Sequence, residues 1–371
     1  MIRRARGLLL ATGLLLSACG AEPDIVPGPK PPPPGTAAPV TAPSATTSAA
    51  TPIPPERPPL VDLQRAALTK MVAAFAAHDA KAVAALYTPG VVSGSPGPTG
   101  WDEEEGARAV EESHKALFAA FPDMKWLSPR AYILGDVAIQ EWISNGTHTG
   151  DLGSMKASGK PTGMHGISVY VFDQDGLIRK DDTYFDAATI ARQTGSLPGP
   201  ARAVPTLPSP DTTLVTAAAG TPEEAKRADA ARAMYAAFAG KDESAFLATL
   251  APEVVHRAYS APADTTGHKA AAEGYRAMHK AFPDLAVSPS KVWSVGDRVI
   301  AAVVTTGTQK GALGPIKPTG KPVTLHSLDV LTFTADGKVA TIDSYSSSLE
   351  LLGQLGAIPD TKTKAKATPS K

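Results

Sequence analysis

Cysteine is almost absent from this sequence: Cys19 is the only one among 371 residues. An intramolecular disulfide is therefore impossible, and any folded domain must be stabilised by a packed apolar core. Neither sign of charge prevails, because 36 acidic residues balance 36 basic ones, and no basic face or nucleic-acid-reading motif is visible. We therefore expect no nucleic acid among the partners of this protein.

A long hydrophobic run is also missing from the N-terminus. The apolar stretch 7–16 is shorter than the roughly 20 residues that a membrane-spanning helix requires, and arginines precede it. It leads into Leu-Ser-Ala-Cys at 16–19, which resembles the lipobox of bacterial lipoproteins. The resemblance implies that 1–18 are a signal peptide and that Cys19 is the lipidation site. We expect an exported protein held by lipid on a bacterial membrane, with the outer membrane favoured, on its periplasmic or surface side. An ordinary signal peptide with an incidental cysteine is the alternative.

Aromatic residues are missing from 19–59, a segment rich in proline, alanine and threonine. Such a segment cannot bury enough apolar surface to offset the chain entropy that is lost on ordering. We predict that 19–59 form a disordered tether and that the basic segment 360–371 forms a disordered tail.

Three kinds of reactive site have no motif in the sequence. Histidines at metal-binding spacing, a glycine-rich phosphate loop before a helix and a Gly-x-Ser-x-Gly nucleophile turn are not found. We therefore expect no metal and no cofactor.

The sequence does contain an internal repeat at a constant offset of 161 residues, as from His165 to His326. The matching motifs include Phe-Pro-Asp at 121–123 and 282–284, Gly-Lys-Pro at 159–161 and 320–322, and Asp-Gly at 175–176 and 336–337. This period exceeds the roughly 20–50 residues of solenoid units, so each copy should be a whole domain. We predict domain 1 over 60–198, a linker over 199–221 and domain 2 over 222–359.

The pattern within each copy changes from helical to extended. In domain 1, apolar residues at helical spacing predict helices over 63–75 and 103–120. Period-two alternation then predicts strands, and the last strand over 177–185 is followed by a short helix over 187–193 that ends at Gly195. Helices first and antiparallel strands afterwards indicate an α+β fold. We expect two tandem cone-shaped α+β barrels with helices packed on a curved antiparallel sheet.

Several motifs together indicate a family. Gly-Thr-His-Thr-Gly at 146–150, the Asp-Gly turn and the Gln-x-Gly ending at 193–195 resemble the SnoaL-like polyketide cyclases, or ester cyclases, of the nuclear transport factor 2-like superfamily. The second copy shows the same pattern, so the resemblance covers 61–198 and 222–359. It implies a conical pocket in which a carboxylate on the last strand is both acid and base for an aldol ring closure, without metal or cofactor. The resemblance makes Asp186 the catalytic residue.

Asp186 also has a structural interpretation, because it directly precedes the short helix and an aspartate there can cap a free backbone N–H group. Its counterpart in domain 2, Ser347, can cap as well but is no carboxylate. Capping therefore explains both copies, whereas acid–base chemistry would be confined to domain 1. His165 is the second catalytic candidate, as a donor to a substrate carbonyl or a partner of Asp186. Its apolar neighbours and its recurrence as His326 favour a structural, hydrogen-bonded histidine instead.

Further polar and aromatic side chains are concentrated in domain 1, where they line the expected pocket unless they are surface or packing residues. The candidates for substrate binding in both domains are Tyr184, Glu141, Trp142, Asn145, His148, His326 and Tyr345. Domain 2 replaces several of them, with Ala302, Val303 and Gln309 at the positions of Glu141, Trp142 and His148.

Two functions fit these observations. The first is an enzyme whose domain 1 binds an apolar, carbonyl-bearing small molecule and transfers protons, as in a cyclisation or isomerisation. The alternative is a non-catalytic ligand-binding or protein-interaction module. In either case the two domains of one chain could pair sheet to sheet, as dimers do in the superfamily that the sequence resembles.

Overall fold

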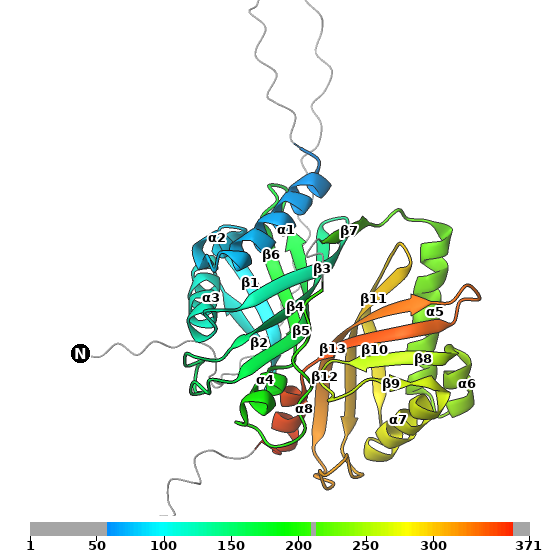
Figure 1. Ribbon diagram of the computed structural model, residues 1–371. Coiled ribbons are helices and arrows are strands. Elements are labelled where there is room, and N and C mark those ends of the chain that lie inside the picture. The colour runs from blue at the N-terminus through cyan, green and yellow to red at the C-terminus, as the bar shows by residue number, and fades with distance from the viewer. Residues whose placement is uncertain (1–57, 209–212, 359–371) are drawn as a thin grey trace, which may run out of the picture. The chain divides into compact units, whose positions relative to one another are not determined.

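The computed structural model describes residues 58–208 and 213–358, and from Pro59 onward these belong to one compact unit (Figure 1). The predicted signal peptide, Cys19, the tether up to residue 57 and the tail 360–371 lie outside these ranges. The predictions about them therefore stay predictions. Within the described ranges, no helix combines the length and the apolar character needed to span a membrane.

The first copy of the repeat folds as a sheet with helices before, within and after it. In chain order its elements are α1 (Leu60–Ala76), α2 (Ala80–Ala84), β1 (Tyr87–Gly97), β2 (Gly100–Glu105), α3 (Ala107–Ala120), β3 (Lys125–Leu134), β4 (Val137–Thr147), β5 (Pro161–Phe172), β6 (Ile178–Phe185) and α4 (Ala187–Thr194). Strand β7 (Leu214–Ala217), which lies within the predicted linker, joins the edge and gives the order β2-β1-β6-β5-β4-β3-β7. Neighbouring strands are antiparallel except β1–β6 and β3–β7.

The second copy repeats this plan. Its elements are α5 (Pro222–Ala239), α6 (Glu243–Ala248), β8 (Leu250–Ala258), β9 (Thr265–Thr266), α7 (Gly267–Ala281), β10 (Ala286–Val295), β11 (Arg298–Thr308), β12 (Pro322–Phe333), β13 (Val339–Ser346) and α8 (Ser348–Leu355). The strand order is β10-β11-β12-β13-β8-β9. As α1 packs against β3, so α5 packs against β10 (Figure 1).

The α+β fold predicted from the sequence is confirmed in both copies, and most element ends agree with the predictions. Helix α4 stops where Gly195 adopts a left-handed φ of 83°. The predicted start of the 103–120 helix is wrong, because residues 100–105 form β2 and α3 begins only at Ala107. Gly106 separates the two elements with a φ of 98°, a conformation that no α-helix contains.

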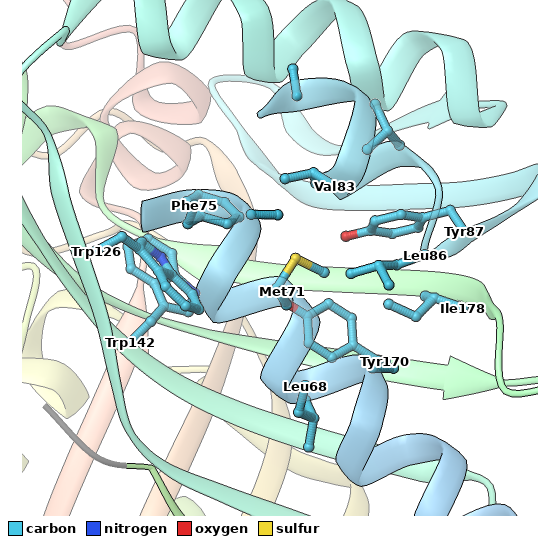
Figure 2. Packing of buried hydrophobic residues seen from close by; sticks show 14 of the residues in the cluster. Leu68, Met71, Phe75, Val83, Leu86, Tyr87, Trp126, Trp142, Tyr170 and Ile178 are labelled. Atoms are coloured by element: carbon cyan, nitrogen blue, oxygen red, sulfur yellow. The ribbon is translucent and has the colours of Figure 1, made fainter. Parts of the chain in front are cut away.

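Side chains cover both faces of the first sheet: helix α1 lies against one face and residues of the second copy against the other. Because successive side chains of a strand point to opposite faces, neighbouring residues have different surroundings. The helix-covered face contacts α1; Figure 2 shows Met71 of this helix among side chains of the sheet. The sheet residues of this cluster include Ala131, Ala138, Trp142, Tyr170 and Phe172. The opposite face clusters instead with side chains of the second copy. Its members include Val137, Ile139, Ile167, Val169 and Tyr184 together with Ile300, Leu328, Val330 and Tyr345.

Gly166 is required on the helix-covered face because the indole of Trp142 lies directly against its backbone. A Cβ atom at this position would overlap the ring of Trp142. The glycine in β5 therefore allows a large aromatic side chain from β4 to lie across the sheet, where its N–H group meets the residues described next.

Candidate functional site

A continuous chain of hydrogen bonds runs through the helix-covered side of domain 1. Nε1 of Trp142 donates to Oγ of Ser168 at 3.2 Å, and this hydroxyl lies 2.8 Å from Oγ1 of Thr183. Thr183 donates to Oδ1 of Asp181 at 2.8 Å, and the hydroxyl of Tyr87 donates to Oδ2 at 2.9 Å. Because Thr183 gives its only proton to Asp181, Ser168 must donate to Thr183. The donors therefore all point toward the carboxylate.

Strand register explains why these side chains meet. Gln140 of β4, Ser168 of β5 and Thr183 of β6 are direct cross-strand partners, so they form one row across the sheet. The adjacent row on the same face joins Tyr170 of β5 to Asp181 of β6. Tyr87 reaches this place from the first residue of β1, which pairs with the start of β6.

Gln140 is the conspicuous member of the row. Its side chain is fully buried, and neither amide atom has a hydrogen-bond partner among the described residues. A buried polar group without a partner costs about 1–3 kcal/mol, so a group of this kind points to a polar atom that it is there to bind. The amide can donate to a carbonyl or accept from a hydroxyl.

The surrounding protein shifts the pKa of the carboxyl group of Asp181 toward neutral. Desolvation by the surrounding protein raises its pKa from 3.8 to about 6, against the opposing hydrogen bonds from Thr183 and Tyr87. The residue as a whole is nevertheless only half-buried. Burial likewise raises the pKa of the neighbouring Tyr170, which stays a neutral phenol. Among the groups of this face, Asp181 is the one suited to act as acid and base.

The residues predicted from the sequence occupy other places, and most of them lie on the opposite face. Glu141 is buried there between two phenols: Tyr132 donates to Oε1, and Tyr345 of domain 2 donates to Oε2 at 2.9 Å. Burial and the charge of Glu141 raise the pKa of Tyr345, so both phenols remain donors. The structure thus brings Glu141 and Tyr345 together.

Asp186 is buried and caps α4, as one of its two interpretations predicted. Its carboxylate accepts from the backbone N–H of Ala188 at 3.2 Å and from the hydroxyl of Thr189 at 2.9 Å. It also accepts from the backbone N–H and the hydroxyl of Ser348 in domain 2, each at 2.9 Å. These contacts hold two helix ends. The acid–base role of Asp186 stays a prediction, whereas these contacts give it a structural role.

The two predicted histidines lie beside aromatic rings. His165 stacks on Tyr259 of domain 2 with ring centroids 4.2 Å apart, and burial lowers its pKa to about 4. His326 lies 5.3 Å from the ring of Trp101 and places Nδ1 2.7 Å from Oε1 of Glu350. Trp101 also contacts Tyr184, the remaining candidate on this face. Because its pKa is lowered to about 4, His165 is neutral at pH 7, whereas a proton donor to a substrate would have to carry the proton.

Three predicted residues lie apart from this group. Trp142 belongs to the helix-covered face and to the hydrogen-bonded chain. Asn145 shares the strand face of Glu141 near the end of β4, where its Nδ2 donates to the carbonyl oxygen of Pro205 at 3.2 Å. His148 is fully buried in the glycine-rich hairpin, with Nδ1 3.2 Å from Oγ of Ser158. Gln309, its counterpart, accepts from Thr319 across the same hairpin of domain 2, which indicates a loop-fixing position in both copies.

Asp181, Tyr87, Gln140, Ser168 and Thr183 were not among the predicted site residues. The signal that could have found them is strand parity: Trp142 implies that Gln140 shares its face, and Phe185 implies the same for Asp181 and Thr183. Within the described ranges, no group of three or more His, Cys, Asp or Glu side chains could hold a metal ion. Two open hollows lie elsewhere: one between the α1–α2 turn and α3, and one between α1 and α2.

Comparison with known proteins gives a family match to each copy of the repeat. The model of the SnoaL-like polyketide cyclase family matches residues 65–194 and 228–355. Similar solved structures include AclR from Streptomyces galilaeus, which is 29% identical over 39% of this chain and 95% of AclR, with a TM-score of 0.33. A SnoaL-like protein from Jannaschia sp. CCS1 is 22% identical over 38% of this chain and 97% of its own, with a TM-score of 0.35. TsrD from Streptomyces laurentii is 24% identical over 36% of this chain and 96% of TsrD, with a TM-score of 0.33. No curated protein gives a significant match.

Proposed function

This chain belongs to the SnoaL-like polyketide cyclase family through both of its domains, and from that premise we propose that domain 1 binds an apolar small molecule that carries a carbonyl group. We propose further that it catalyses proton transfer of the cyclase or isomerase type with Asp181 as acid and base. The observation that carries the proposal is the joint placement of Asp181 and the unpartnered Gln140 on the helix-covered face.

The proposed chemistry uses one proton twice. The carboxylate of Asp181 takes a proton from the carbon next to the substrate carbonyl, and the protonated acid then returns it to the developing alkoxide or to another carbon. A carboxyl whose pKa is about 6 can perform both steps near neutral pH. The amide N–H of Gln140 donates to the carbonyl oxygen, whose negative charge grows as the proton leaves.

Apolar side chains next to this row favour an apolar substrate. Met71, Trp142 and Tyr170 belong to the same buried cluster (Figure 2). Water is excluded by such surroundings, which strengthens each electrostatic contact with the reacting group.

Non-catalytic binding is the second candidate function, and a specific observation favours it. Both oxygens of Asp181 already accept a hydrogen bond, from Tyr87 and from Thr183. These hydrogen bonds stabilise the ionised carboxylate and lower its pKa, which favours holding a ligand over taking a proton from one.

The experiment follows the exchange of the α-protons of 2-acetonaphthone, an apolar aromatic ketone, in D₂O by ¹H NMR. We expect the wild-type protein to accelerate the exchange, Asp181→Asn to lower the rate by about 100-fold or more, and Asp186→Asn to retain it. Loss of exchange in Asp186→Asn alone would return the acid–base role to Asp186. Binding of the ketone, seen by quenching of tryptophan fluorescence, without any exchange would establish the non-catalytic candidate instead.

We also propose that the two domains pair within one chain. Contacts between them support this arrangement: Tyr345 with Glu141, Ser348 with Asp186 and His165 with Tyr259. The apolar cluster shared by Ile139, Ile167, Ile300 and Leu328 supports it as well. Such a pairing buries, in each sheet, the face that the helices do not cover. The helix-covered face of each sheet then contacts only residues of its own domain.

Export and lipid anchoring form the remaining part of the proposal and rest on the sequence alone. Cys19 follows a small-residue motif after a short apolar run, and 19–59 can act as a tether from the membrane surface. We expect metabolic labelling with a radioactive fatty acid to mark the wild-type protein in bacterial membranes. Cys19→Ser should remain unlabelled, and equal labelling of both proteins would contradict lipidation at Cys19.

A further inference from the structure

Strand β2 forms an unpaired edge of the first sheet. It stands last in the strand order, so within the described ranges it pairs only with β1. The backbone N–H of Gly106, just after β2, donates to the carbonyl oxygen of Val91 in β1. Because inward and outward backbone groups alternate along an antiparallel pair, the N–H and C=O groups of Glu103 and Glu105 point away from β1. These two residues therefore offer free backbone groups to one more strand.

The side chains of this edge are acidic and lack partners. The four consecutive acidic residues 102–105 are all exposed, and within the described ranges none of them forms an ion pair. Partial desolvation and then the negative charge of Asp102 raise the pKa of Glu104, which shares its strand face. Acidic side chains on an edge discourage pairing with most strands, but they suit a strand with basic side chains at alternate positions.

The second copy has no equivalent acidic edge. Its last strand, β9, consists of Thr265 and Thr266 alone, which are neutral. Asp264, the acidic residue just before β9, already pairs with Arg202 at 2.5 Å. A basic segment that pairs with an acidic edge therefore has one place to bind in each chain.

The C-terminal tail of this chain has the complementary pattern. Lys362, Lys364 and Lys366 stand at alternate positions, so an extended backbone carries all three on one face. No acidic residue follows Asp360, and the segment 361–368 contains no proline, so each of its residues has a backbone N–H group to donate. Opposite charges on neighbouring strands stabilise their pairing, whereas like charges weaken it. The segment 361–368 thus fits the edge of β2 in charge and in spacing.

The tail also begins beside the start of β2. Helix α8 lies against the turn that precedes β2, where a Cβ atom at Gly353 would overlap the carbonyl oxygen of Pro98. This contact belongs to the proposed pairing of the two domains, and the inference rests on that pairing. Residues 359–371 can extend over roughly 40 Å, whereas the six residues of β2 span about 20 Å. The tail is therefore long enough to run along β2 from its first residue, parallel to it.

We propose that the segment 361–368 docks on β2 of the same chain as a parallel strand. Its lysines pair with the carboxylates of β2, and its backbone bonds the free groups of Glu103 and Glu105. The tail contains no large apolar side chain with which to fold alone, so the edge supplies the partners that order it. Docking closes an edge of the first sheet that strands of other molecules could otherwise join.

The test measures amide hydrogen exchange by ¹H–¹⁵N NMR in the protein labelled with ¹⁵N-glutamate. We expect the N–H groups of Glu103 and Glu105 to exchange about fivefold or more faster in a variant that ends at Ile358 than in the full chain. About 1 M NaCl should speed their exchange in the full chain, because it reduces the screening length to about 3 Å. The N–H of Glu104 points to β1 and is the internal control. Equal exchange of Glu103 and Glu105 with and without the tail would overturn the proposal.

Lys364→Glu supplies the matched variant and Lys371→Glu its control, because both reverse one charge of the tail and only the first lies within 361–368. Lys364→Glu should remove most of the protection of Glu103 and Glu105, and Lys371→Glu should retain it. Equal protection in the two variants would contradict pairing along β2. A single calorimetric transition in both shows that the domains remain paired, so a failure of docking is distinguishable from a failure of the pairing.

Two other occupants for the tail have their own outcomes in this test. Protection of Glu103 and Glu105 that appears only as the protein concentration rises would mean that the tail of a second copy docks on β2. Binding of the full chain to phosphatidylglycerol vesicles through the tail, without protection of Glu103 and Glu105 in their absence, would assign the tail to an anionic lipid surface. Either result would overturn docking within one chain.

Discussion

Asp181 is the residue whose titration should be visible in the stability of the protein. Its pKa is 3.8 without the surrounding protein and about 6 within it, so the folded chain keeps this proton over a range where the unfolded chain has lost it. The contribution of Asp181 to the free energy of unfolding therefore falls as pH rises from about 4 to about 6 and stays low above that range.

Asp181→Asn removes this titration. We expect the stability difference, variant minus wild type, to rise across pH 4 to 6 and to level off above it, because the wild type alone loses stability there. Urea unfolding at closely spaced pH values measures the difference. A difference that does not change with pH would show that the carboxyl group has an ordinary pKa.

The sequence predicted which residues share a strand face but not which of the two faces the helices cover. Period-two spacing correctly grouped Ile139 with Glu141 and Tyr184 with Asp186. The helix-covered face could not be recognised from the sequence because β4 is buried on both sides, with Ala138 and Ile139 equally inaccessible. A strand that is buried on both faces lacks the alternation of apolar and polar residues that would identify its helix-covered side.

At the scale of elements, α4 and α8 are linked through one side chain. Asp186 caps α4 and accepts from the N–H and the hydroxyl of Ser348, the first residue of α8. Ser347, which corresponds to Asp186 in domain 2, makes no capping hydrogen bond with its side chain. The two N-cap positions of the repeat therefore differ in what they stabilise.

This difference predicts unequal effects of alanine. Asp186→Ala removes a cap and leaves buried donors unpaired, so we expect the free energy of unfolding to fall by about 2–4 kcal/mol. Ser347→Ala, the matched control, should change it by less than about 0.5 kcal/mol because no hydrogen bond is lost. Denaturant unfolding of both variants checks the prediction, and similar losses in the two would refute the linking role of Asp186.

Helix α8 also approaches the first copy closely at Gly353. A Cβ atom at this position would overlap the backbone carbonyl oxygen of Pro98, in the turn between β1 and β2. Gly274 in α7 has no atom within 4 Å of such a Cβ and has an ordinary helical neighbourhood. Backbone cannot yield as a side-chain end can, so Gly353 allows a contact that no larger residue permits.

Alanine should therefore act in opposite directions at the two glycines. Gly353→Ala should lower the free energy of unfolding by about 1–3 kcal/mol through overpacking. Gly274→Ala should be neutral or stabilise by up to about 1 kcal/mol, because alanine is the better helix former. Thermal unfolding of both variants gives the comparison. Equal stability of Gly353→Ala and the wild type would mean that α8 does not rest against Pro98.

Element types were predictable to the extent that they follow from local patterns. The helix predicted over 63–75 from apolar spacing is found as α1, and the stop predicted at Gly195 is found as well. The strands β1 and β2 were missed, since β1 contains two prolines and several glycines, which no local pattern assigns to a strand. Their place in the sheet comes from pairing with β6, which lies about 90 residues away in the chain.

At the scale of the whole molecule, the proposed pairing predicts cooperative unfolding. The apolar cluster that contains residues of both copies, such as Ile139 and Leu328, would be exposed if either domain unfolded alone. We therefore expect one calorimetric transition, with equal calorimetric and van't Hoff enthalpies. Ala302→Asp, which places a charge in this cluster, should separate it into two transitions. Two transitions in the wild-type protein would contradict the pairing.

The direct test of the central claim is a crystal structure of the protein with 2-acetonaphthone. The account predicts the ketone on the helix-covered side of domain 1, with its oxygen within hydrogen-bond distance of Nε2 of Gln140 and its methyl carbon facing Asp181. A ketone bound instead against Glu141, His165 or Tyr184 on the opposite face would contradict it.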